Sequence, residues 1–122
     1  MKWLPKVILC LCAGVMLLMV VAVWIRKSWR EEAIRSACIQ NIRNVQQAVR
    51  GHSGMRQINI GATLNPSAII SEDGLTGYMK TPKCPSGGTY SFLSYNPDVG
   101  ELYCTCSLSK FKKHEPDDYS DW

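Results

Sequence analysis

The chain has 122 residues, of which 46% are hydrophobic and 20% are charged, and it contains six cysteines. This length leaves room for one domain at most and excludes a large catalytic scaffold such as a barrel. Lys2 and Lys6 carry two units of the net charge of +4, so the rest of the chain carries only about +2. Nucleic-acid binding, which would require a dense basic patch, is therefore not indicated.

A run without any charged residue extends from Val7 to Ile25. As a helix with a rise of about 1.5 Å per residue it would cover roughly 28 Å, which is close to the hydrocarbon thickness of a bilayer. No small-x-small cleavage site follows the run, as it would in a secretory signal. We therefore expect residues 1–25 to be an uncleaved transmembrane anchor, in which Cys10 and Cys12 are ordinary small apolar residues in contact with lipid.

The orientation of this anchor does not follow from charge, because basic residues flank the run equally on both sides. The cysteines beyond the anchor provide another criterion, since small domains are often stabilised by disulfides that persist outside the cytoplasm. We therefore expect a single-pass protein with a cytoplasmic N-terminus and with residues 26–122 on the periplasmic or extracellular side.

Residues 26–51 have the pattern of an amphipathic stalk helix that continues the anchor and stops at Gly51. Its apolar positions recur at steps of four, four, three and four residues, as expected for one face of a helix. We expect this helix-packing face to lie against the protein's own head, and packing against a neighbouring copy is the alternative. The face consists of Ile34, Cys38, Ile42, Val45 and Val49.

Residues 52–108 are predicted to form a small head. Its first part, rich in glycine up to residue 70, reads as a loop with one short turn, and residues 71–79 favour a short helix. Residues 89–95 and 101–106 have strand character and flank a loop-forming stretch, so we expect a β-hairpin. Together with the long helix, this predicts an α+β fold.

Residues 109–122 are dominated by charged side chains and are predicted to be a flexible tail with little to bury. The two histidines, His52 and His114, are expected to be solvated. No catalytic motif occurs in the chain, so we expect neither an enzyme, nor a cofactor, nor a small-molecule substrate.

The four cysteines beyond the anchor are the candidate site residues, and they are Cys38, Cys84, Cys104 and Cys106. Residues two apart in a strand are separated by about 6.5–7 Å, which disfavours a bond between Cys104 and Cys106. We expect disulfides between Cys84 and Cys106 and between Cys38 and Cys104. The alternative is a zinc site formed by Cys84, Cys104 and Cys106, with His114 or Cys38 as the fourth ligand.

The run Cys-Pro-Ser-Gly-Gly-Thr-Tyr at residues 84–90, downstream of Cys-Ile-Gln-Asn-Ile-Arg-Asn-Val at residues 38–45, resembles small prepilin-like proteins of bacteria. These are relatives of the pseudopilins of type II secretion and of type IV pilins. The resemblance implies a bacterial inner-membrane protein with a helix, half anchor and half stalk, that carries a small head with a β-sheet. The usual Gly-Phe-Thr-Leu-x-Glu leader motif is absent, and the first glutamate is Glu31.

The resemblance implies a non-catalytic structural protein of the bacterial cell envelope. Such a protein would act through helix packing and head contacts in a secretion or pilus-type assembly, with itself or other pilin-like subunits as partners. The alternative function is a membrane-tethered module that binds zinc or a ligand through its outer cysteines.

Overall fold

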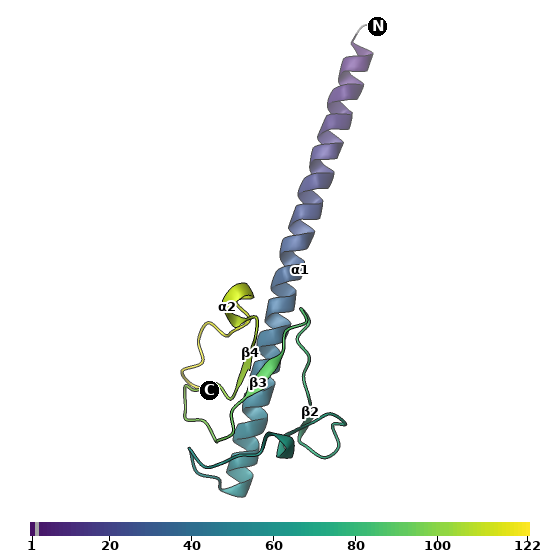
Figure 1. Cartoon of the computed structure of the whole chain (residues 1–122). Coiled ribbons are helices and arrows are strands. Elements are labelled where there is room, and N and C mark those ends of the chain that lie inside the picture. The colour runs from purple at the N-terminus through teal and green to yellow at the C-terminus, as the bar shows by residue number, and fades with distance from the viewer. Residues whose placement is uncertain (2) are drawn as a thin grey trace. The chain divides into compact units, whose positions relative to one another are not determined.

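The structure is a computed structural model that describes residues 1 and 3–122. It divides into two units, Met1–Ala33 and Ile34–Trp122, and helix α1 (Leu4–Arg56) runs from the first into the second (Figure 1). The remaining elements, in chain order, are a 3-10 turn (Pro66–Ala68), strands β1 (Ile70–Ser71), β2 (Met79–Lys80), β3 (Tyr90–Phe92) and β4 (Cys104–Cys106), and helix α2 (Ser109–Lys112). The predicted α+β fold, with one long N-terminal helix and a small head, is confirmed.

The first unit is a single helical segment whose apolar side chains are exposed on every side. Leu9, Leu18 and Trp24 are each about 70% exposed, and none of the apolar stretch is buried. A helix that is apolar around its whole circumference requires an apolar environment, and in length and composition this one can cross a membrane. The predicted anchor thus coincides with a helix that is long and apolar enough to span a bilayer.

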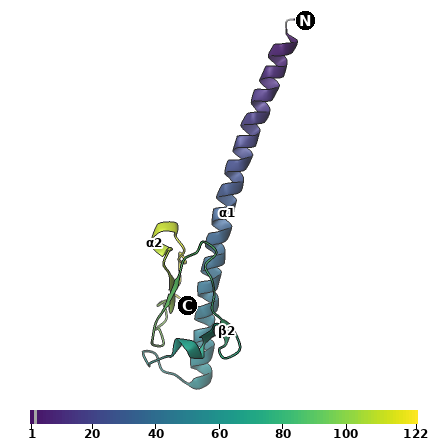
Figure 2. The same ribbon diagram turned by 45° about the vertical axis from the view of Figure 1, so that its right-hand side comes forward.

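The second unit is organised around the face of α1 that the sequence pattern identified. Cys38, Ile42, Val45 and Val49 are completely buried, and Ile34 is partly buried at the edge of the unit. These side chains belong to one core cluster with residues of the head, including Leu64 and Tyr103. In both views the β3–β4 pair lies beside this half of the helix (Figures 1 and 2). The helix-packing face is therefore covered by the protein's own head, as predicted.

Helix α1 ends five residues later than the predicted stop at Gly51. His52 and Ser53 on the extra turn are buried, and the Ser53 hydroxyl donates to the side-chain oxygen of Asn96 at 3.0 Å. Burial against the head thus outweighs the modest helix penalty of a glycine. Gln57, the first residue after the helix, has a positive φ of 54°, which allows the amide of Ile58 to donate to the carbonyl of Ser53, a bond that ends many helices.

The predicted hairpin is present as the antiparallel pair β3–β4, with Tyr90 opposite Cys106 and Phe92 opposite Cys104. The strands are shorter than predicted because Asn96 turns the chain toward the end of α1, donating from its side chain to the Ile58 carbonyl at 3.0 Å. The pair is attached to α1 through Gln46, a buried residue outside the predicted face. Its amide group donates to a carbonyl of the hairpin at 3.0 Å and accepts a backbone N–H at 2.9 Å.

The prediction of a short helix over residues 71–79 is wrong. That segment is a loop between β1 and β2, which pair in parallel with Ile70 opposite Met79. The carboxylate of Asp73 accepts the backbone N–H groups of Leu75 and Thr76, a local arrangement that competes with helix formation. A Cβ on Gly77 would lie 2.7 Å from the carbonyl oxygen of Ile69, the residue before β1.

The C-terminal residues 109–122, predicted to be a flexible tail, are packed on the head in this structure. His114 and Pro116 are buried, and Arg50 donates to the backbone oxygen of Trp122 at 2.8 Å. The same guanidinium donates to the carbonyls of Pro97 and Asp98 at 2.7 Å. The charged composition predicted solvent exposure, and Phe111 is indeed 88% exposed, but His114 and Pro116 are buried.

Candidate metal centre

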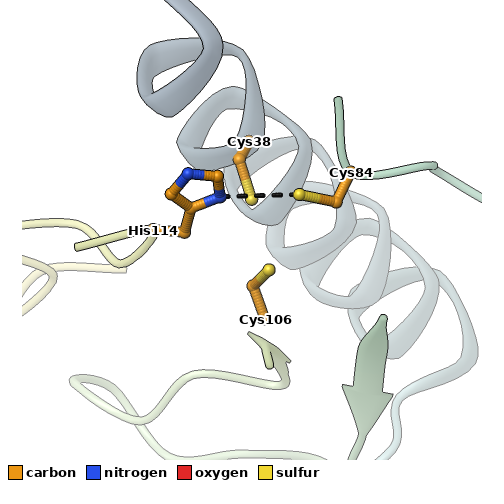
Figure 3. Close-up of side chains that lie close together, drawn as sticks. All are labelled: Cys38, Cys84, Cys106 and His114. Atoms are coloured by element: carbon orange, nitrogen blue, oxygen red, sulfur yellow. Dashed lines mark hydrogen bonds between the residues drawn. The ribbon is translucent and has the colours of Figure 1, made fainter. Parts of the chain in front are cut away.

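Four side chains from four separate segments converge in the second unit. Cys38 comes from α1, Cys84 from the loop before β3, Cys106 from the end of β4, and His114 from the segment after α2. Figure 3 shows the three thiol groups and the imidazole ring directed toward one another. All four residues are buried, with exposed fractions between 0 and 7%.

The distances within this cluster are short. One ligand atom from each of the four residues can be chosen so that all four lie within 4.8 Å of one another. Within the cluster, the Cys84 Sγ atom and the His114 Nδ1 atom are 3.5 Å apart. Three sulfur atoms and one nitrogen atom at this spacing form a set that could hold a metal ion.

The loop that carries Cys84 turns tightly around its sulfur atom. The amide of Gly87 donates to the Cys84 carbonyl at 3.0 Å. Gly87 has a positive φ of 78°, a conformation that residues other than glycine rarely adopt. The backbone N–H groups of Ser86 and Gly88 point at the Cys84 sulfur. A Cβ on Gly88 would lie 2.9 Å from the Cys106 Sγ atom, so a glycine is needed where this loop meets the strand.

His114 is directed inward by the residue before it and by the helix. Lys113 adopts a left-handed conformation with φ 52°, which reverses the chain directly after α2. Arg35 on α1 donates to the Lys113 carbonyl at 2.8 Å and to the Asp117 carboxylate at 2.9 Å. Because Arg35 precedes Cys38 by one helical turn, α1 positions both the thiol and the histidine segment.

Burial dominates the electrostatics of the thiols. It raises the pKa of Cys38 to about 12, although a contact with the Tyr90 hydroxyl opposes this shift. Burial acts in the same direction on Cys84, but the amide donors of Ser86 and Gly88 and the neighbouring thiols bring its pKa below the ordinary value. Burial likewise raises the pKa of Cys106. Amide donors thus oppose burial at the Cys84 sulfur, whereas burial prevails at Cys38 and Cys106.

The histidine is held in its neutral form. Burial, and then the positive charges of Lys112 and Arg35, lower the pKa of His114 below its ordinary value. A neutral imidazole keeps one ring nitrogen with a free electron pair, which is the form that binds a metal. The prediction that His114 is solvated is wrong, because the ring is only 2% exposed.

The structure differs from the predicted disulfides. All six cysteines, each of which lies in the described part of the chain, are free thiols. The alternative metal set is corrected at one position, because Cys38 and not Cys104 completes it. Cys104 and Cys106 are both buried, but positions two apart in a strand are separated by about 6.5–7 Å. Of the two, only Cys106 offers a sulfur atom within the 4.8 Å group.

His52 lies outside this cluster. His52 is 8% exposed, contrary to the predicted solvation, and its ring lies edge-on to Tyr78 with the centroids 5.1 Å apart. A separate cleft between α1 and the C-terminal residues is lined by Arg43, Gln46, Gln47, Arg50, Asp121 and Trp122. The guanidinium of Arg50 there is already bound by three backbone oxygens.

No family model, curated protein or solved structure matches the chain. The geometry of the two units therefore carries the functional argument.

Proposed function

We propose that this chain is a non-catalytic, membrane-anchored structural protein of the bacterial cell envelope, pilin-like in architecture, that displays its small head through helix α1. The observation that carries the proposal is the change of environment along one helix. Its first part is apolar and exposed, while from Cys38 onward its apolar face is buried by the head. A membrane supplies the missing apolar environment of the first part.

The same observation limits how copies of the protein could pack. The stripe formed by Cys38, Ile42, Val45 and Val49 is completely covered within the chain. Contacts with other pilin-like subunits, or with further copies, must therefore use the exposed apolar surface of residues 4–33 or the outer surface of the head. In a secretion or pilus-type assembly the buried stripe would fix the head to its own helix and leave the anchor for lateral packing.

The proposed orientation, with the N-terminus in the cytoplasm and the head in the periplasm or outside, is supported by the resemblance to prepilin-like proteins. The argument from disulfides loses its basis, because the thiols of the head are free. Adding protease to cells whose outer membrane has been permeabilised should degrade residues 34–122 and spare a cytoplasmic marker. A fully protected head would overturn the orientation.

Membrane attachment is tested with a matched pair of leucines. Leu17 in the anchor and Leu75 in the head are 67% and 87% exposed, so lysine at either position leaves the head's core intact. Lysine at the centre of a membrane helix costs roughly 2.5–3.5 kcal/mol, and lysine on a wet surface costs almost nothing. We expect Leu17→Lys, and not Leu75→Lys, to reduce recovery in carbonate-washed membranes. Equal recovery of both variants would contradict the anchor.

As an uncleaved anchor, residues 1–25 should remain attached to the head. The intact mass of the membrane-bound protein should then correspond to a chain that still contains residues 1–25. A shortened and N-methylated chain would show conventional prepilin processing and would contradict this part of the proposal. A soluble chain that lacks the apolar run would contradict the whole of it.

A further inference from the structure

The cluster of Cys38, Cys84, Cys106 and His114 has the dimensions of a tetrahedral metal site. With Zn–S and Zn–N bonds of about 2.3 and 2.0–2.1 Å, the edges of the tetrahedron are roughly 3.8 Å between sulfurs and 3.6 Å between sulfur and nitrogen. The Cys84–His114 pair already lies at 3.5 Å, and the other pairs need to close by about 1 Å at most. A disulfide would require sulfur atoms about 2.05 Å apart.

The donor set selects the ion. Three thiolates and one imidazole, without a carboxylate in the group, are soft ligands, which favour zinc over calcium, magnesium or manganese. Four protein ligands leave no open position for water, and the whole set is buried. Both features are typical of structural zinc sites and not of catalytic ones.

Neighbouring hydrogen-bond donors surround the sulfur atoms of the cluster. The Cys84 sulfur faces the amides of Ser86 and Gly88, and the Cys106 sulfur faces the amide of Leu108. The Tyr90 hydroxyl lies 3.2 Å from the Cys38 sulfur. Such donors stabilise thiolates at metal sites and orient them. The close approach of Gly88 to Cys106 is what allows these loops to meet around one point.

We propose that Cys38, Cys84, Cys106 and His114 bind one Zn²⁺ ion, which clamps the loop before β3, the end of β4 and the C-terminal segment onto helix α1. On binding, Zn²⁺ displaces the protons of those thiols that are protonated, and the neutral ring of His114 contributes a nitrogen. Three thiolates and Zn²⁺ sum to one negative charge, which the nearby Arg35 and Lys112 offset. This site is independent of membrane attachment.

The proposal also assigns the remaining outer cysteine. Cys104 lies two residues before Cys106 on the same strand, is 0% exposed, and has its pKa raised to about 12 by burial. It lies outside the cluster and serves as a small apolar core residue. Cys104 and Cys106 thus form a matched pair with the same residue type, strand and burial but with different roles.

The test uses the full chain, purified in detergent micelles under reducing conditions from cells supplied with zinc. We expect elemental analysis to find about one zinc per chain in the parent and in Cys104→Ala, and less than about a tenth of that in Cys106→Ala. Zinc content that is equal in the two variants would overturn the proposal. A zinc-free parent would do the same.

A second measurement does not depend on whether Cys106→Ala folds. After removal of zinc by a chelator, the parent is titrated with Co²⁺, which reports its ligands by absorption. We expect the intense visible bands of tetrahedral cobalt and the ultraviolet bands of thiolate ligands, both abolished by one equivalent of Zn²⁺. Weak bands of octahedral cobalt, or the absence of thiolate bands, would overturn the site. The result leaves the membrane-anchor proposal unaffected, because Leu17→Lys tests that separately.

Discussion

The substitution Ile42→Ala tests whether the apolar stripe of α1 belongs to the protein's own head. Ile42 is 0% exposed and lies in the core cluster between Cys38 and Val45. Truncating a buried isoleucine to alanine costs about 2–5 kcal/mol, because the transfer energy is lost and a cavity remains. A unit of the size of residues 34–122 has a free energy of unfolding of roughly 4–13 kcal/mol. The variant should therefore lose a large fraction of the stability of the head.

The assay is pulse proteolysis of the full chain in micelles across a urea series, at a fixed zinc concentration because bound metal adds to stability. With a urea dependence of about 1–1.5 kcal/mol per M, a loss of about 3 kcal/mol lowers the midpoint by roughly 2–3 M. Met55→Ala on the same helix is the control, since Met55 is 66% exposed and its truncation should change little. A midpoint for Ile42→Ala within about 0.5 M of this control would refute the packing argument.

Three further tests probe the loops and the C-terminal segment. Arg50→Ala removes three donors from backbone oxygens, so amide exchange at residues 119–122 should rise and stability should fall by about 1–3 kcal/mol, with Arg50→Lys intermediate; unchanged exchange would contradict the docking. Gly77→Ala should destabilise by about 1–3 kcal/mol because its Cβ meets a carbonyl at 2.7 Å, whereas Gly51→Ala on the open helix surface should stabilise by about 0.5–1 kcal/mol in the same urea assay. The bonds to the Asp73 carboxylate lower its pKa from 3.8 to about 2, so its contribution is present above pH 3.8 and disappears as the pH falls toward 2. The stability difference between the parent and Asp73→Ala should shrink over that interval. A difference independent of pH would argue against the hydrogen bonds to the Asp73 carboxylate in this loop.

The long helix and its packing face could be predicted because both are periodic in the sequence. The charge-free run and the spacing of Cys38, Ile42, Val45 and Val49 are local patterns, and local patterns determine helices. The hairpin was predictable for the same reason. The end of the helix was not, because His52 and Ser53 extend it through contacts with residues far along the chain. The loop after β1 was misjudged because Asp73 can cap a helix or form a turn, and only its partners decide between them.

The candidate metal centre could be predicted from the sequence only in part. The sequence showed which residue types could bind a metal. Whether Cys38 or Cys104 joins His114 depends on how four segments far apart in sequence pack together. The burial of His114 could not be predicted from its neighbours in sequence, which are charged. The left-handed conformation of Lys113 turns the chain so that His114 becomes buried.

The sequence positions of the four proposed ligands also determine when the head can be completed during synthesis of the protein. The apolar part of α1 is made first and can enter a membrane while the rest of the chain is still being translated. The head cannot be completed at that stage, because one of its four central side chains, at position 114, is made 76 residues after Cys38. The stripe of α1 that the head finally covers is therefore uncovered during elongation. At that stage it is a binding surface for chaperones or other nascent chains, which the finished protein no longer offers.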